Sequence, residues 1–362
     1  MYFKITNQEE CHHGYQHKYG LNILDKPFEK EGSCVPGGLY FTTLEHIHKF
    51  YDYGVWLRVI IIPDDAQMIQ DPYKDKWRAD KIILGKKYPL YNIETIKKFN
   101  LIVNEEFISS ASRFGQTDFL EYWLKHCKKS GLEFKYTSLA IDYASLFNKV
   151  EVLDWWKQSG LKLKYTEDAI DFASEDGHIE ALKWWLKQDK ESGLKLKYTN
   201  YAINFASKNG QVEVLDWWLK QHKESGLELK YTSDAIDFAS EKGHVEVLKW
   251  WKQSSLELKY TSNAIDWASE DGHVEVLEWW RKQHKKSGLE LKYTRRAIDF
   301  ASENGHIEVL EWWRKQHKKS GLELKYTENA IDWALKKKVL QWWKKSGLEL
   351  KYTLLTIDWS KY

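Results

Sequence analysis

Histidine and cysteine side chains that could bind a metal ion are concentrated at the start of the chain. Seven of them fall within the first 48 residues: Cys11, His12, His13, His17, Cys34, His46 and His48. Structural zinc sites usually pair their thiolate and imidazole ligands at short fixed spacings such as C-x2-C, and no such pair occurs here. A polar loop followed by an amphipathic helix at Thr43–Tyr51 explains the same residues. We therefore predict no metal and no cofactor, with a zinc site as the alternative.

A second set of residues in this region could serve group transfer. The order His13-Gly14, Gly20-Leu21-Asn22 and Gly37–Phe41 resembles the order HG…GL…G-x-YF of ADP-ribosyltransferase folds. The spacings are short, no catalytic glutamate can be assigned, and a glycine-turned loop entering a strand explains the same residues. We predict that the chain is not an enzyme and has no catalytic residues. The alternative is an ADP-ribosyltransferase-like or other enzymatic N-terminal domain, which a pocket joining His13 and Tyr40 would favour.

The rest of the chain is organised by a pattern that recurs with a nearly fixed period. Ala297–Trp313, AIDFASENGHIEVLEWW, is one copy. Copies begin at Phe107, Ala140, Ala169, Ala202, Ala235, Ala264, Ala297 and Ala330, and a truncated copy begins at Thr356. Successive full copies lie 33 or 29 residues apart. A period of this size indicates a stacked repeat protein, in which each unit packs only on its neighbours.

Each copy contains two short amphipathic segments, which we expect to form a pair of helices. In the fifth copy the pattern predicts helix A at Ala235–Glu241 and helix B at Val245–Trp251, with Gly243 as the turn between them. Thr232 precedes helix A and offers a hydroxyl cap. The linker L-E-L-K-Y-T alternates apolar and polar residues, as an extended or hairpin segment would. The 29-residue steps lack four residues after the Trp-Trp pair, about one turn of helix.

The repeat resembles the ankyrin repeat in its second half. The stretch G-H-x-E-V-L-x-W-W matches the ankyrin consensus G-H-x-E-V-V-x-L-L in register, and A-I-D-x-A-S lies over T-P-L-H-x-A-A. No copy has Thr-Pro-Leu-His or the Gly-Ala-Asp link. The resemblance implies a mainly α, ankyrin-type helix-turn-helix solenoid of about eight repeats plus a C-terminal stub. It also places the Trp-Trp pairs, among them Trp312 and Trp313, in the core.

The Trp-Trp pair and the L-K-Y-T link resemble the ankyrin repeat proteins of giant viruses of the mimivirus type. Gly20–Leu84 also resembles the leader domain of that family. We accordingly divide the chain into a small N-terminal α/β or mainly β domain at residues 1–95 and an ankyrin-like repeat array at 96–362. In the first domain we expect three strands and a linking helix, at Leu39–Thr43, Val55–Ile62, Lys81–Leu84 and Ile93–Asn100 respectively.

Charge and composition exclude several classes of partner. The formal net charge of +2 is too small to indicate nucleic-acid binding, and no apolar run approaches the roughly 18 residues of a membrane span. Three cysteines in 362 residues indicate a reducing compartment. We therefore expect a monomer in the cytoplasm, that of the host cell if the protein is viral, although a place in the virion is also open. Its expected partner is an unidentified host or viral protein.

One position of helix A, directly after A-I-D, is aromatic in every copy after the first. In ankyrin repeats this position is variable and faces the concave surface. We therefore predict that the chain acts as a protein–protein interaction scaffold or adaptor whose concave face binds the partner. The alternative is that these rings pack against the linker tyrosines of neighbouring repeats. The Lys and Glu of the linker and the Asp of A-I-D would add polar contacts. The predicted contact residues are Phe172, Phe205, Phe238, Trp267, Phe300, Trp333, Lys230 and Lys292.

Overall fold

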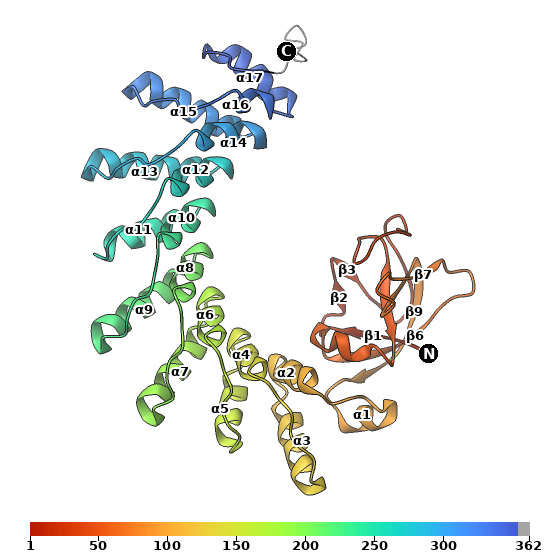
Figure 1. The fold of residues 1–362 in the computed structure, drawn as a ribbon. Coiled ribbons are helices and arrows are strands. Elements are labelled where there is room, and N and C mark those ends of the chain that lie inside the picture. The colour runs from red at the N-terminus through yellow and green to blue at the C-terminus, as the bar shows by residue number, and fades with distance from the viewer. Residues whose placement is uncertain (354–362) are drawn as a thin grey trace. The chain divides into compact units, whose positions relative to one another are not determined.

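The computed structural model describes residues 1–353, which form two compact units. The first, residues 1–169, contains a β-sheet and two complete helix pairs, and the second, from Ile170 onward, contains the remaining pairs (Figure 1). The truncated copy predicted at Thr356 lies outside the described residues. The predicted boundary after residue 95 falls within the helix at Ile93–Phe99, and it stays a prediction.

The sheet of the first unit has seven strands in the order β4-β9-β6-β1-β5-β8-β7, and every neighbouring pair is antiparallel. Of the two forms expected, α/β or mainly β, the mainly β form is therefore correct. The predicted amphipathic helix at Thr43–Tyr51 is replaced by a 3-10 helix, η1, at Ile47–Tyr53. The strands are β1 Tyr2–Thr6, β4 Gly20–Ile23, β5 Leu39–Thr43, β6 Trp56–Ile61, β7 Met68–Gln70, β8 Trp77–Ala79 and β9 Lys81–Pro89, with a separate hairpin of β2 Cys11–His12 and β3 Tyr15–Gln16.

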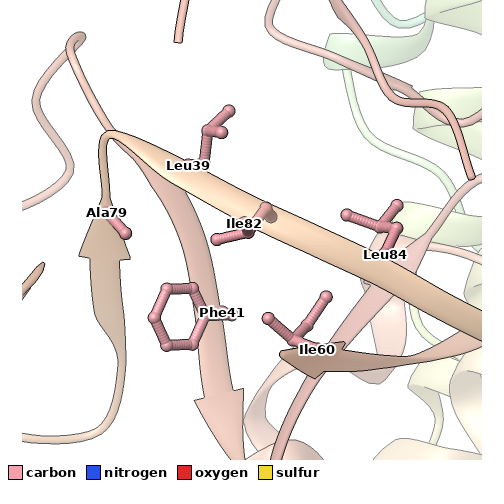
Figure 2. Close-up of a cluster of buried hydrophobic side chains, with 6 residues drawn as sticks. All are labelled: Leu39, Phe41, Ile60, Ala79, Ile82 and Leu84. Carbon is pink, nitrogen blue, oxygen red and sulfur yellow. The ribbon is translucent and has the colours of Figure 1, made fainter. Parts of the chain in front are cut away.

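One face of this sheet carries its apolar core. Side chains that alternate along the central strands meet in a cluster of Leu39, Phe41, Ile60, Ala79, Ile82 and Leu84 (Figure 2). Each is no more than 3% exposed, and all except Ala79 lie in strands expected from the sequence. Alternation places every second residue of a strand on the same face, which is why short strands suffice to build this core.

The sheet is joined to the first repeat by buried aromatic rings. The Tyr51 hydroxyl donates to the carbonyl of Ile102 at 3.0 Å, and its ring meets Phe107 edge-on at 4.7 Å between centroids. Tyr91 packs on Phe107 from the other side, at 5.1 Å. Helix α1, at Ile93–Phe99, links the two parts as expected and is capped by the side chain of Asn92. Within the first unit, sheet and repeats therefore share one apolar interface.

The described repeats, within residues 105–346, comprise eight pairs of helices, each with a helix A followed by a helix B. Helix B has 14 residues in five pairs and nine in the two pairs whose sequence is four residues shorter, which confirms the expected loss of one helical turn. In chain order the pairs are α2 Glu105–Arg113 and α3 Thr117–Ser130; α4 Leu139–Leu146 and α5 Val150–Gln158; α6 Asp168–Glu175 and α7 Ile179–Ser192; α8 Tyr201–Lys208 and α9 Val212–Ser225; α10 Asp234–Glu241 and α11 Val245–Gln253; α12 Asn263–Glu270 and α13 Val274–Ser287; α14 Arg296–Asn304 and α15 Ile307–Ser320; α16 Asn329–Asp332 and α17 Lys337–Ser346.

Within the second unit the A helices form one row and the B helices another (Figure 1). The A helices approach one another more closely than the B helices do. Small residues allow this approach, because the two alanines of A-I-D-x-A-S are fully buried in each of these repeats through α14, as Ala235 and Ala239 illustrate. The fold class expected from the sequence is therefore confirmed.

The linkers between repeats are extended and contain no strand among the described residues. Of the two forms predicted, the extended segment is correct and the hairpin is not. Successive linkers are connected by side chains instead of a backbone ladder, since the Tyr231 hydroxyl donates to the Glu257 carbonyl of the next linker at 3.1 Å. The last pair is atypical, as expected of a terminal repeat, because α16 has only four residues and Leu335 is 89% exposed.

Candidate functional site

The predicted aromatic positions of helix A form a row of rings in the second unit, which we call the helix A stripe. Its members are Phe172, Phe205, Phe238, Trp267, Phe300 and Trp333. Phe172 is 38% exposed and Trp333 is 42% exposed, while the four between them are half-buried. The side chains of the stripe are therefore neither buried in the core nor fully exposed to solvent.

Rings of the stripe pack on one another from repeat to repeat. Phe238 stacks on Trp267 with centroids 5.8 Å apart and planes 11° from parallel, and it meets Phe205 at 5.9 Å. Phe300 and Trp333 stack at 6.1 Å. The half-buried rings keep part of their surface exposed. This arrangement gives a nearly continuous, partly exposed apolar strip along consecutive A helices.

Polar groups border the strip at its centre. The Lys208 ammonium lies over the rings of both Phe205 and Phe238, at 5.1 and 5.2 Å from their centroids. Tyr201, which is 56% exposed, meets Phe205 edge-on at 5.2 Å. Sequence inspection missed both neighbours, which lie one helical turn to either side of Phe205, at the spacing that places residues on one helix face.

Five linker tyrosines of the second unit make no ring contact with the stripe: Tyr198, Tyr231, Tyr260, Tyr293 and Tyr326. Each lies against the second tryptophan of the following helix B, as with Tyr231 and Trp251 at 4.8 Å between centroids. The predicted alternative, in which the helix A rings pack under these tyrosines, is therefore wrong. The rings of the stripe pack on one another because the tyrosines are engaged with helix B.

The linker lysines are engaged inside the array. Lys230 donates from Nζ to the Tyr198 carbonyl at 3.1 Å and lies 4.5 Å from the centre of the Tyr198 ring. Lys292 makes the same pair of contacts with Tyr260, at 3.3 and 4.5 Å. Both side chains thus connect consecutive linkers. Contact of these two lysines with a partner protein stays a prediction. Their contacts with the linker tyrosines give them a structural role as well.

The aspartate of A-I-D has a structural role that the sequence did not reveal. Asp237 is 1% exposed, and its two carboxylate oxygens accept hydrogen bonds from the backbone N–H and the hydroxyl of Thr261, at 3.0 and 2.6 Å. The Thr261 hydroxyl also accepts from the N–H of Asn263, and so caps the next helix A. The expectation that this aspartate offers a polar contact to a partner is wrong, because the following linker covers it.

The tryptophan pairs are core, as predicted. Trp312 is 6% and Trp313 is 2% exposed, and their rings meet edge-on at 5.0 Å. The Trp313 Nε1–H donates to the Ser269 hydroxyl of the preceding repeat at 3.3 Å, and the Trp312 Nε1–H donates to Glu278 at 2.6 Å. Both indole N–H groups of this pair therefore have an acceptor in the repeat before it.

The Gly-His pairs also connect neighbouring repeats. Gly243 adopts a left-handed φ of +78°, and a Cβ placed on it would lie 2.7 Å from Nδ1 of His273 in the next repeat. Burial lowers the pKa of His244 and of His306, which favours the neutral imidazole. His244, His273 and His306 each pack across the glycine turn of the repeat before them.

A cavity of about 390 Å³ lies in the sheet-bearing part of the first unit. Both His13 and Tyr40 line it, and a pocket joining these two residues is what an enzymatic N-terminal domain predicts. Its wall is mostly apolar and aromatic, with Lys4, His12 and His17 among its polar residues. Cys34 lies at its edge, where the ammonium of Lys76 is 3.0 Å from Sγ and lowers the pKa of the thiol.

The seven histidines and cysteines considered as metal ligands do not all lie together in the structure. His12, His13, His17 and Cys34 line the cavity, whereas Cys11, His46 and His48 do not. Within residues 1–353 no group of three or more His, Cys, Asp or Glu side chains is arranged to hold a metal ion. No helix in the same range is long and apolar enough to cross a membrane.

Known proteins that are similar to this chain indicate the family to which it belongs. The family model for ankyrin repeats in many copies matches residues 170–219 and 265–312. A protein of Acanthamoeba polyphaga mimivirus described as an ankyrin repeat protein is 37% identical over 167 residues, which cover 43% of this chain and 82% of the relative. An uncharacterised protein of the same virus is 44% identical over 27% of this chain and 73% of its own length.

The array is thus an ankyrin-type repeat solenoid. The chain belongs to the ankyrin repeat proteins of the giant-virus, mimivirus type. Among solved structures, the ankyrin repeat domain of Bcl-3, a member of the IkappaB protein family, is 16% identical and matches 53% of this chain and 96% of its own, at a TM-score of 0.36. The resemblance of Gly20–Leu84 to a leader domain stays a prediction.

Proposed function

We propose that this protein is an interaction scaffold or adaptor whose helix A stripe binds a partner protein. Ankyrin repeats are in general protein-binding modules, and the stripe would lie on the concave face expected of such an array. The observation that carries the proposal is the run of stacked, partly exposed rings on consecutive A helices. Exposed apolar patches of this kind mark interaction sites, and aromatic side chains supply most of the anchoring energy in interfaces.

The charged side chains beside the stripe would affect the rate of association with the partner more than the affinity. Lys208 already lies on two of the rings, and a partner carboxylate that approached it would meet a cation held in place. Rim charges mainly alter association rate and its salt dependence. We therefore propose an apolar-centred contact with an acidic rim on the partner, in the cytoplasm of the infected cell or in the virion.

Affinity capture from infected-cell lysate tests this proposal. The bait is the full chain, compared with a variant carrying Phe238→Ala, Trp267→Ala and Phe300→Ala together. Trp250→Ala is the matched control, because Trp250 is also a half-buried tryptophan but belongs to helix B. We expect wild type and control to retain the same protein and the triple variant to lose it. Equal capture by a folded triple variant would contradict the proposal.

A second candidate function is favoured by the cavity that joins His13 and Tyr40. It is an ADP-ribosyltransferase-like or other enzymatic N-terminal domain, with the repeats as its targeting arm. The described lining supplies one carboxylate, Asp25, and no glutamate. Release of nicotinamide from NAD by wild type, with loss of release in His13→Ala, would support it. No release by either protein, at enzyme concentrations near those of the substrate, would count against a transferase of this type.

A further inference from the structure

The cavity of the first unit contains a cation with no counter-ion. Lys4 lies in the central strand β1, and its ammonium donates to the Tyr40 carbonyl at 2.8 Å. Among the described residues it has no other hydrogen bond and no ion pair. The half-buried carboxylate of Glu10 is already held by the Arg58 guanidinium through two contacts. An ammonium has three donors, so two of those of Lys4 have no acceptor among residues 1–353.

A buried imidazole nitrogen without a partner lies in the same wall. His17 is 4% exposed, lines the cavity, and has no hydrogen-bond partner at Nδ1 among the described residues. Burial holds its pKa near 3, so the ring is neutral and Nδ1 can donate or accept according to its tautomer. Buried polar atoms are nearly always satisfied, so this nitrogen calls for a partner such as an ordered water, an ion or a bound molecule.

Neighbouring groups set the polarity of this end of the cavity. His12 accepts the Asn7 N–H at Nε2, which leaves Nδ1 as its donor, and its ring lies 5.9 Å from that of His17. Tyr15 packs on His17 at 4.9 Å. The rest of the wall is mostly apolar, with Phe41 and Tyr53 among its rings. A volume of about 390 Å³ is at the lower end of the range of small-molecule sites.

We propose that this cavity binds a small organic anion, whose carboxylate or phosphate group meets Lys4 and His17 while its flat apolar body lies against the aromatic wall. An anionic oxygen would fill the free donors of Lys4 with charge-assisted hydrogen bonds, which are the stronger kind. The aromatic lining would bury the body of the ligand. The proposal concerns what the cavity holds, and it depends neither on partner binding by the helix A stripe nor on a reaction at His13.

Two pairs of probes distinguish the carboxylate from the phosphate source. Indole-3-acetate is compared with the neutral indole-3-acetamide, and AMP with adenosine, by calorimetric titration of the full chain. At least one anion should bind, with its neutral counterpart at least about tenfold weaker, which is the loss expected when a charged hydrogen bond is removed. If neither anion bound more tightly than about 1 mM, or if the neutral probes bound equally well, the proposal would be wrong.

Two further measurements locate the site. Lys4→Met removes the charge and keeps the length of the side chain, and should reduce affinity for the anion about tenfold without changing that for the neutral probe. Lys30→Met, at an exposed lysine outside the cavity, should change neither. In wild type, the bound anion should slow alkylation of Cys34 by iodoacetamide, followed by mass spectrometry. If the bound anion left the alkylation rate of Cys34 unchanged, the anion would not occupy this cavity. If Lys4→Met bound the anion as tightly as wild type, Lys4 would not be its ligand. The alkylation measurement uses the wild-type protein and does not require any variant to fold.

Discussion

The aspartate–threonine contact defines how one residue links two repeats. Asp237 accepts two hydrogen bonds from Thr261, and Asp266, Asp299 and their equivalents accept the same pair from the threonine of the following linker. In the fourth repeat the position is Asn204, which accepts from the Thr232 N–H and donates to its hydroxyl. The chain therefore contains its own neutral variant of the contact.

We predict that Asp237→Asn changes the free energy of unfolding little at pH 7, whereas Asp237→Ala lowers it by about 1–2 kcal/mol because the Thr261 N–H loses its acceptor. Urea denaturation compares the three proteins. A loss on Asp237→Asn as large as that on Asp237→Ala would show that the charge, not the geometry, is what the site requires.

The pH dependence of the same pair has a defined sign. Burial raises the pKa of Asp237 in the folded protein, although both Thr261 hydrogen bonds oppose the shift. The folded state therefore binds the proton more tightly than the unfolded chain, whose aspartate titrates near about 3.9. As pH falls from 7 through the folded pKa, wild type should gain stability relative to Asp237→Asn, and the gain should level off below about 3.9. A relative loss on acidification would contradict this.

The buried tryptophans support a prediction about packing. Trp313→Ala should cost about 3–5 kcal/mol, because the ring fills much of the narrow apolar face of α15 and its hydrogen bond to the Ser269 hydroxyl is lost. Equilibrium unfolding with a loss below about 1 kcal/mol would count against a core role. Trp250→Ala, at a half-buried position of helix B, should cost less.

At the scale of elements, the turn between helices A and B couples each repeat to the next. Gly243→Ala introduces both a strained left-handed backbone and an overlap with the His273 ring. Gly226→Ala is the matched control, since Gly226 has a φ of +69° but no atom within 4 Å of its added Cβ. Gly243→Ala should therefore cost about 1–2 kcal/mol more than the control.

The double variant Gly243→Ala with His273→Ala distinguishes the cost of the strained backbone at residue 243 from the cost of the overlap between its methyl group and the His273 ring. It should recover the difference between the two glycine variants, because the alanine methyl group no longer meets a ring. Denaturant unfolding of the four proteins provides the comparison. If the two glycine variants lost equal stability, the histidine would have no part in the coupling.

Elements were predictable from the sequence where they depend on local pattern. Helix A of the fifth repeat was expected at Ala235–Glu241 and begins one residue earlier, and the strand at Leu39–Thr43 was placed correctly. Cross-repeat contacts were missed because they join residues 21 to 44 positions apart, at positions set by stacking. A signal existed, since the Asp-to-Thr separation is 24 residues in short repeats and 28 in long ones. The cavity was not predictable, because its wall comes from several strands and loops.

For the whole molecule, the repeat architecture predicts uneven stability. Each repeat contacts only its neighbours, so unfolding propagates from an end with few contacts. The last described repeat has a four-residue helix A and lacks the Gly-His turn. Amide hydrogen exchange in α16 and α17 should be faster than in α8 to α11. Equal protection in the two regions would contradict this account of the array.

The most direct test of the central claim measures melting temperature and partner affinity on the same single variants, Phe238→Ala, Trp267→Ala and Phe300→Ala, with Trp250→Ala as control. The captured partner is the ligand. Each stripe variant should weaken binding by about tenfold or more, as anchor residues do, while losing only about 1 kcal/mol of stability from the broken ring stack. Trp250→Ala should leave affinity intact. Unchanged affinity in all three stripe variants, whatever their melting temperatures, would contradict the account.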